Sequence, residues 1–120
     1  MDKEPSEREY FVNVGEALAR VRDNKSLYQK MLDMFLESGD FASLEESLLQ
    51  KNYSKAADIA HAIKGMTGNL SLTRLYEASG RLTEELRQEL AADETLADFW
   101  AAYSKTRIYV EAIAKEMAAE

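Results

Sequence analysis

Residues 52–70, NYSKAADIAHAIKGMTGNL, carry the pattern that decides the fold. Small and apolar side chains recur in this stretch every three or four residues, which is the period of an amphipathic α-helix. Asn52 precedes the pattern and can accept a hydrogen bond from the first turn, so it is the expected N-cap. We therefore expect one long helix with a single apolar face, made by Ala56, Ile59, Ala60, Ile63, Thr67 and Leu70.

Three shorter helices are expected before this stretch. Residues 1–11 are charged and polar and are expected to form a flexible tail. Asn13 is the expected N-cap of the first helix, Gly39 the C-cap of the second, and Asp40 the N-cap of the third. Their apolar faces are predicted to contain Val14, Ala17, Leu18 and Val21; Leu27, Tyr28, Met31, Leu32 and Phe35; and Leu44 and Leu48.

Two further helices are expected after it. Ser71 is the predicted N-cap of a helix whose inward residues are Leu72, Leu75, Ser79, Leu82, Leu86 and Leu90. Asp93 opens the last helix, whose buried face is predicted to hold Leu96, Phe99, Trp100, Tyr103, Val110, Ile113 and Met117. Every segment has the helical period and the connections are short, which favours antiparallel neighbours. The fold class is therefore all-α: residues 12–118 form an antiparallel four-helix bundle with one or two additional short N-terminal helices.

Composition limits what such a bundle can do. The chain has 120 residues, a size that suits one domain, and its single proline, Pro5, lies near the N-terminus. There are no cysteines, which excludes disulfides and thiolate metal sites. The formal net charge of −7 argues against a nucleic-acid surface and against docking to anionic lipid.

The same features indicate where the protein works. No apolar run approaches the ~20 residues that span a bilayer. The polar start, MDKEPSEREY, cannot serve as the apolar core of a signal peptide. We expect a cytoplasmic monomer, and the initial methionine with its polar leader favours a free-standing domain.

His61 is the only histidine and stands out in its setting. On a helical wheel it points roughly 160° away from Ile63, the centre of the apolar face. Its neighbours one and two turns away are small: Ala57, Gly65 and Gly68. Glycine inside a helix costs about 1 kcal/mol relative to alanine, so two glycines beside one histidine require a reason. Close approach of another macromolecule is one such reason.

Each of these features also has a purely structural explanation. A lone histidine on a helix surface is usually a solvated polar residue, and a surface lysine such as Lys64 is usually a solvating charge. Gly65 and Gly68 would also permit tight packing against a neighbouring helix. A metal site is disfavoured because zinc sites take about four ligands and no second histidine or cysteine exists.

The stretch AHAIKGMTGNLSLTRL resembles the phosphoacceptor motif of histidine-containing phosphotransfer (HPt) domains. The core of that motif, H-x-x-K-G, is found at His61, Lys64 and Gly65. Upstream, NKSLYQKMLDMFLES resembles the family helix that covers one end of the bundle, and the resemblance spans roughly residues 12–118.

The resemblance implies a role for each of these residues. His61 would be phosphorylated, Lys64 would help to neutralise the phosphoryl group, and Ala57, Gly65 and Gly68 would form the surface where a receiver domain docks. Two positions depart from the family. Ser71 stands where the family often has glycine, and Thr83 stands where it often has Gln or Glu facing the histidine ring, so Thr83 is the candidate for orienting the ring.

The implied function is that of a histidine phosphocarrier between aspartates of response-regulator receiver domains in two-component signalling. A ring nitrogen would attack the phosphorus of an aspartyl phosphate, and the receiver would supply the magnesium ion, so this chain needs no cofactor. No glycine-rich nucleotide-binding loop is present, which indicates a carrier and not a kinase.

Two alternatives remain open at this point. The phosphoacceptor domain of a chemotaxis-type histidine kinase has a similar bundle but receives its phosphoryl group from a kinase domain. A helical adaptor that is never phosphorylated would use the glycine-flanked patch for binding and would not need His61.

Overall fold

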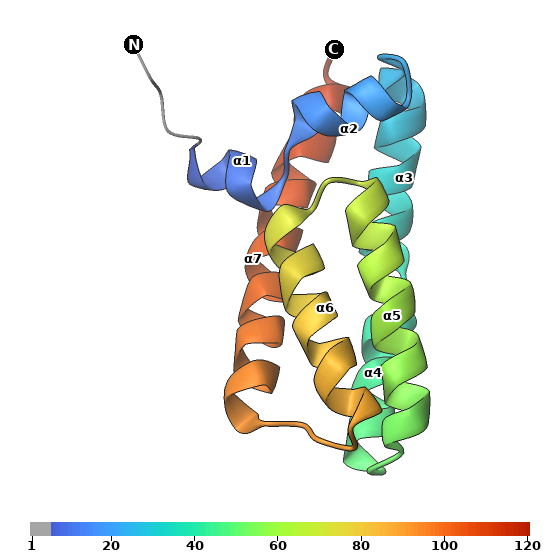
Figure 1. Ribbon diagram of the computed structural model, residues 1–120. Helices are drawn as coiled ribbons and strands as arrows, with labels where there is room; N and C mark the ends of the chain where they lie inside the picture. The colour runs from blue at the N-terminus through green and yellow to red at the C-terminus, as the bar shows by residue number, and fades with distance from the viewer. Residues whose placement is uncertain (1–5) are drawn as a thin grey trace.

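Seven α-helices make up most of residues 6–120, the part of the chain that the computed structural model describes (Figure 1). In chain order they are α1 (Glu7–Phe11), α2 (Val14–Arg20), α3 (Lys25–Glu37), α4 (Asp40–Leu49), α5 (Tyr53–Asn69), α6 (Thr73–Arg87) and α7 (Asp93–Ala118).

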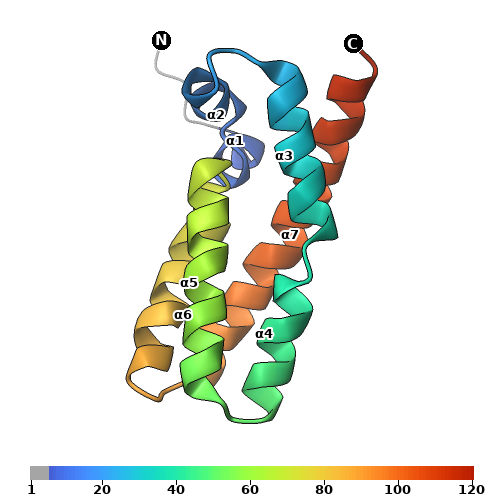
Figure 2. The same ribbon diagram turned by 90° about the vertical axis from the view of Figure 1, so that its right-hand side faces the viewer.

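Four columns of helix form the bundle. Three of them are α5, α6 and α7, and the fourth consists of α3 followed by α4, placed end to end (Figure 2). With 26 residues, α7 is about 39 Å long and packs along this column and against α6. The short helices α1 and α2 cover the end where α5 turns into α6 (Figure 1). The predicted all-α bundle with additional short N-terminal helices is confirmed. None of the described helices is long and apolar enough to cross a bilayer.

The core lies on the shared axis of the four columns. Aliphatic side chains come mainly from α5 and α6, and aromatic rings from α3, α4 and α7 pack together near the junction of α3 with α4. Phe41 stacks on Tyr103 with 4.0 Å between ring centroids, and Phe35 meets both rings edge-on. The fully buried large side chains are Val12, Tyr28, Leu32, Phe35, Leu44, Ile63, Leu70, Leu72, Leu75, Leu82, Leu86 and Phe99.

Three asparagines set the starts of helices. The side chains of Asn13, Asn24 and Asn52 each accept a hydrogen bond from the backbone N–H three residues later, which confirms the predicted caps at Asn13 and Asn52. The predicted caps at Gly39 and Asp40 are wrong. Ser38 ends α3 in an extended conformation and Gly39 is the N-cap of α4, so Asp40 is already helical.

The predicted flexible tail is wrong for residues 7–11, because these residues form α1. Ser6 caps this helix and Phe11 is buried, while Arg8 makes an ion pair with Glu116 of α7. A helix of five residues is too short for its period to be visible in the sequence, and the burial of Phe11 holds it on the bundle. Residues 1–5 lie outside the described part of the chain.

Two leucines that were expected to face inward are exposed. Leu90 lies beyond the end of α6, because the chain leaves the helix through Glu89, whose φ of 59° is left-handed. Leu27 lies in the first turn of α3, at the edge of the bundle, and is 42% exposed.

The turn between α5 and α6 is held by α2. Ser71 is buried with a left-handed φ of 57°, so it is not the predicted N-cap of α6, a position taken by Leu72. The Ser71 hydroxyl donates to Glu16 at 2.8 Å and accepts from Arg20 at 2.6 Å. Arg20 also donates to the Glu16 carboxylate at 2.7 Å, and the hydrogen bonds that Glu16 accepts from Ser71 and Arg20 hold the pKa of its carboxyl below the ordinary value.

Two substitutions separate the strain at Ser71 from its hydrogen bonds. Ser71→Ala loses both side-chain hydrogen bonds and keeps the left-handed backbone, so the free energy of unfolding should fall by about 1–2 kcal/mol. Ser71→Gly loses the same bonds but relieves the strain, so it should be about 1 kcal/mol more stable than Ser71→Ala. Urea unfolding of the wild type and of the two variants measures both differences. Equal stabilities of Ser71→Ala and Ser71→Gly would show that the left-handed backbone at position 71 is not strained.

Tyr28 ties α3 to the end of α5. Its ring is fully buried, its hydroxyl donates to the Leu70 carbonyl at 3.0 Å, and burial raises its pKa to about 12. The neutral phenol is therefore favoured in the folded state. Its contribution to the free energy of unfolding is fully present below pH 10.

Alkaline pH should remove that contribution. Between pH 10 and about 12 the unfolded chain ionises Tyr28 while the folded chain does not, so stability falls as pH rises. Relative to Tyr28→Phe, the wild-type free energy of unfolding should drop by about 1–3 kcal/mol across this window. Urea titrations of both proteins at several pH values measure the difference, which stays constant if the raised pKa is wrong.

Candidate functional site

His61 lies on the outer face of α5, at the middle of that helix. Figure 2 shows α5 between α6 and α4, with its outer side uncovered. Ala60, one residue before His61, and Ile63, two residues after it, are fully buried, while His61 itself is exposed. The predicted outward orientation of the ring is confirmed, and it follows from the caps and apolar residues that fix the rotation of α5.

The imidazole has no partner within residues 6–120: no hydrogen bond or ion pair of the described residues involves it. Asp58, one turn earlier, is paired with Arg87 of α6 at 3.9 Å and not with the ring. Both ring nitrogens are therefore available to solvent. A neutral, accessible imidazole is a nucleophile that can form a covalent intermediate.

Gly65, one turn after His61, leaves open space. It is exposed, and a Cβ added there would meet no atom within 4 Å. Packing inside the protein therefore gives no reason for a glycine at this position, and no side chain stands on the surface here, one turn from His61. Its predicted role in docking a receiver stays a prediction.

Gly68 has a different explanation. It is half-buried, and a Cβ there would lie 3.0 Å from Cε1 and 3.1 Å from Cδ1 of Tyr76 on α6. The close approach of the Tyr76 ring accounts for this glycine, which is the packing alternative weighed from the sequence. Its docking role stays a prediction without support from an open surface.

Ala57 does not belong to the exposed patch. It is 2% exposed, so its predicted place on the docking surface is wrong. The helical wheel assumed a single buried face, whereas α5 packs against both α4 and α6 and therefore buries a wider arc. The exposed residues on the outer side of α5 are Ser54, Lys55, Asp58, His61, Ala62, Gly65 and Asn69.

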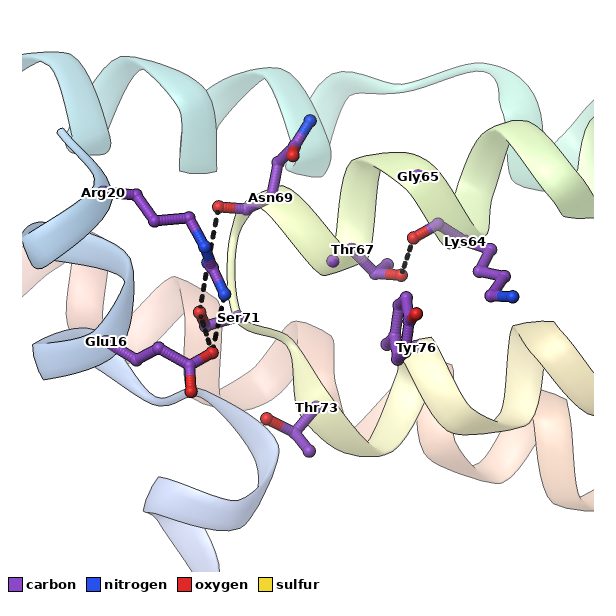
Figure 3. A pocket seen from close by; sticks show the side chains of 10 residues that line it. Glu16, Arg20, Lys64, Gly65, Thr67, Asn69, Ser71, Thr73 and Tyr76 are labelled. Atoms are coloured by element: carbon purple, nitrogen blue, oxygen red, sulfur yellow. Dashed lines mark hydrogen bonds and ion pairs between the residues drawn. The ribbon is translucent and has the colours of Figure 1, made fainter.

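Lys64 lies along the groove between α5 and α6. Its ammonium is 5.5 Å from the centroid of the Tyr76 ring, and its Cε would be 3.4 Å from a Cβ added at Gly80 (Figure 3). It is half-buried and forms no ion pair with a described carboxylate. The lysine therefore keeps its charge available, one turn from His61.

Thr83 is level with the histidine but is turned into the bundle. Residues of α5 and α6 that are equally far from Leu72 along the chain lie at the same level, as the contacts of Gly68 with Tyr76 and of Lys64 with Gly80 show. His61 lies eleven residues before Leu72, and Thr83 lies eleven residues after it. Thr83 is buried, however, and its hydroxyl donates to the Ser79 carbonyl at 2.7 Å. The structure shows no contact that supports the predicted role in orienting the ring.

A groove of about 530 Å³ continues from this surface toward the α5–α6 turn. Figure 3 shows Arg20 and Glu16 from α2 at one end and Lys64 and Tyr76 at the other. Tyr76 and Gly80 are site residues that the pattern of a single helix does not predict. Tyr76 and Gly80 follow Leu72 by the same numbers of residues by which Gly68 and Lys64 precede it. In an antiparallel hairpin that turns near Leu72, this equal spacing predicts that each pair lies side by side.

A family model for the Hpt domain matches residues 30–119, which is three quarters of the chain and includes α4 to α7 and most of α3. No curated protein and no solved structure gave a significant match.

Proposed function

The chain belongs to the Hpt domain family, whose members serve as histidine phosphocarriers in phosphorelays, and we propose that His61 is the residue it uses. The observation that carries this proposal is the exposure of the imidazole. It is the only histidine in the chain, and it stands on a well-packed helix beside the open surface at Gly65.

The proposed donor is the aspartyl phosphate of a receiver domain. A ring nitrogen of His61 attacks the phosphorus, an N–P bond forms, and the bond from phosphorus to the aspartyl oxygen breaks. The aspartate leaves as a carboxylate and the ring proton passes to solvent. The reverse step delivers the phosphoryl group to the aspartate of a second receiver.

Little charge stabilisation is needed from this chain. Phosphoryl transfer depends mainly on positioning and on neutralising the oxygens of the transferred group. Lys64 supplies one cation, three residues from His61 on the same helix. We propose that the partner receiver holds the magnesium ion and that this chain binds no cofactor of its own.

The partner is proposed to dock over the outer face of α5. A receiver must bring its aspartate within bonding distance of the ring, so a broad and flat surface is required beside His61. Gly65 provides that surface, because no side chain rises there and none of the described residues covers it.

The direct test is a transfer reaction. The purified protein is mixed with a panel of phosphorylated receiver domains and magnesium, and bound phosphate is then tested for stability in acid and in base. Phosphohistidine is expected, which is acid-labile and base-stable. Absence of label with every receiver would favour the adaptor function, and label that appears only with a kinase domain and ATP would favour a kinase phosphoacceptor.

A further inference from the structure

Between α5 and α6, a glycine of each helix faces a side chain of the other helix. Gly68 of α5 lies against the Tyr76 ring, where a Cβ would come within 3.0 Å of ring carbon. Gly80 of α6 lies against the Lys64 chain, where a Cβ would meet Cε at 3.4 Å and Cδ at 3.7 Å. The Tyr76 ring therefore requires a glycine at position 68, whereas a Cβ at Gly80 would make ordinary van der Waals contact with the lysine.

The side chains of Tyr76 and Lys64 meet each other. The Lys64 ammonium is 5.5 Å from the centroid of the Tyr76 ring, which is within the range of a cation–π contact. Tyr76 is 40% exposed, so the ring stands at the surface with one side against Gly68 and is available to the lysine. Figure 3 shows the two side chains beside each other on facing helices.

The direction of the lysine is important. Side chains on a helix lean toward its N-terminus, so the Lys64 chain is directed from its own turn back toward the turn that carries His61. The alkyl chain lies beside Gly80 and the ammonium lies near the ring, so the side chain rests along the groove between the two helices. The ammonium is therefore held beside the Tyr76 ring, and Lys64 itself lies one turn of α5 from His61, before any phosphate arrives.

We propose that Tyr76 is a positioning residue for Lys64, holding its ammonium where the phosphoryl group on His61 will need it. This inference rests on the proposed function of His61 and adds a second helix to the site. Tyr76 does not touch the reacting atoms. It acts through Lys64, and the aromatic face is the part of Tyr76 that matters, because its hydroxyl makes no hydrogen bond to a described residue.

The test uses a donor that needs no protein partner. Phosphoramidate phosphorylates His61 when a ring nitrogen attacks phosphorus, the P–N bond of the donor breaks and ammonia leaves. Tyr76→Leu is expected to slow this reaction about two- to fivefold, the range that an exposed cation–π contact contributes. Tyr76→Phe keeps the aromatic face and is expected to restore the wild-type rate.

A double-mutant cycle shows whether Tyr76 acts through the lysine. Lys64→Met keeps an unbranched chain and removes the charge, so it should slow phosphorylation by itself. In that background Tyr76→Leu should have no further effect. A matched control is Tyr10→Leu, because Tyr10 is 44% exposed and contacts Glu77 of α6 but lies on α1, so its rate should stay at the wild-type value.

A spectroscopic measurement reports on the contact itself. The ε-methylene protons of Lys64 should resonate upfield of other lysines, because they lie near the Tyr76 ring. The shift should vanish in Tyr76→Leu and persist in Tyr76→Phe.

The outcomes separate this inference from the proposed function. If neither phosphoramidate nor any receiver phosphorylates His61 in the wild type, both fail. If His61 is phosphorylated and Tyr76→Leu reacts at the wild-type rate, or slows equally in the Lys64→Met background, the positioning role is wrong and the phosphocarrier function stands.

Discussion

His61→Gln is expected to leave no acid-labile phosphate on the protein after incubation with a phosphorylated receiver. Glutamine keeps the polarity and roughly the length of histidine but has no nucleophilic nitrogen, so transfer should fall by at least about 1,000-fold. Because the side chain is exposed and makes no hydrogen bond to a described residue, the free energy of unfolding should change by no more than about 0.5 kcal/mol. Radiolabel transfer and urea unfolding measure the two quantities.

A matched substitution on the same helix controls for the change of side chain. Ser54→Gln also places a glutamine on the exposed side of α5, two turns before His61, and should retain the wild-type label. Label that persists in His61→Gln would refute the assignment of the phosphorylated residue. Loss of label in both variants would indicate damage to α5 or to docking instead.

Gly65→Trp is expected to slow transfer from a receiver strongly while the fold remains intact. A Cβ at this position meets nothing within 4 Å, so an indole fits without a clash inside the protein. The same indole stands on the surface where the receiver must approach. A misplacement of about 1 Å between reacting groups can cost about 100-fold in rate, and we expect a loss of that order.

Although transfer by Gly65→Trp should slow, the free energy of unfolding of this variant should not fall. Glycine is among the poorest helix formers, so replacing it in the interior of α5 should keep or raise the free energy of unfolding by a few tenths of a kcal/mol. Ala101→Trp, on the exposed side of α7, is the control and should leave the transfer rate unchanged. Normal transfer by Gly65→Trp would place the docking surface elsewhere on the molecule.

The long helices could be predicted from the sequence because their periods and caps are local. Asn52 and the small apolar residues of α5 fix both the start of that helix and the direction of His61. The helix α1 could not be predicted, because its five residues are held by contacts with α6 and α7, which are far away in sequence. Ser71 was misassigned for a similar reason, since its left-handed backbone is stabilised by partners on α2.

In the candidate site, too, the features set by one helix could be predicted, and the features set by contacts between helices could not. His61, Lys64 and Gly65 lie within one helical turn of each other, and their order along the chain is enough to bring them together. The burial of Ala57 depends on two neighbouring helices, and the contact of Lys64 with Tyr76 depends on the pairing of α5 with α6. Such contacts require a register between helices, which a single-helix wheel does not contain.

The hydrogen bonds at the top of the bundle bear on where this domain begins. The family match starts at residue 30, yet Phe11, Val12, Ala17 and Tyr28 belong to the core. The backbone N–H of Asn13 donates to the Ser71 carbonyl at 2.9 Å, and the Tyr28 hydroxyl donates to that of Leu70. A fragment cut at the family boundary would uncover the apolar end of the hairpin that carries the histidine. The folding unit of this protein is thus larger than the segment by which its family is recognised.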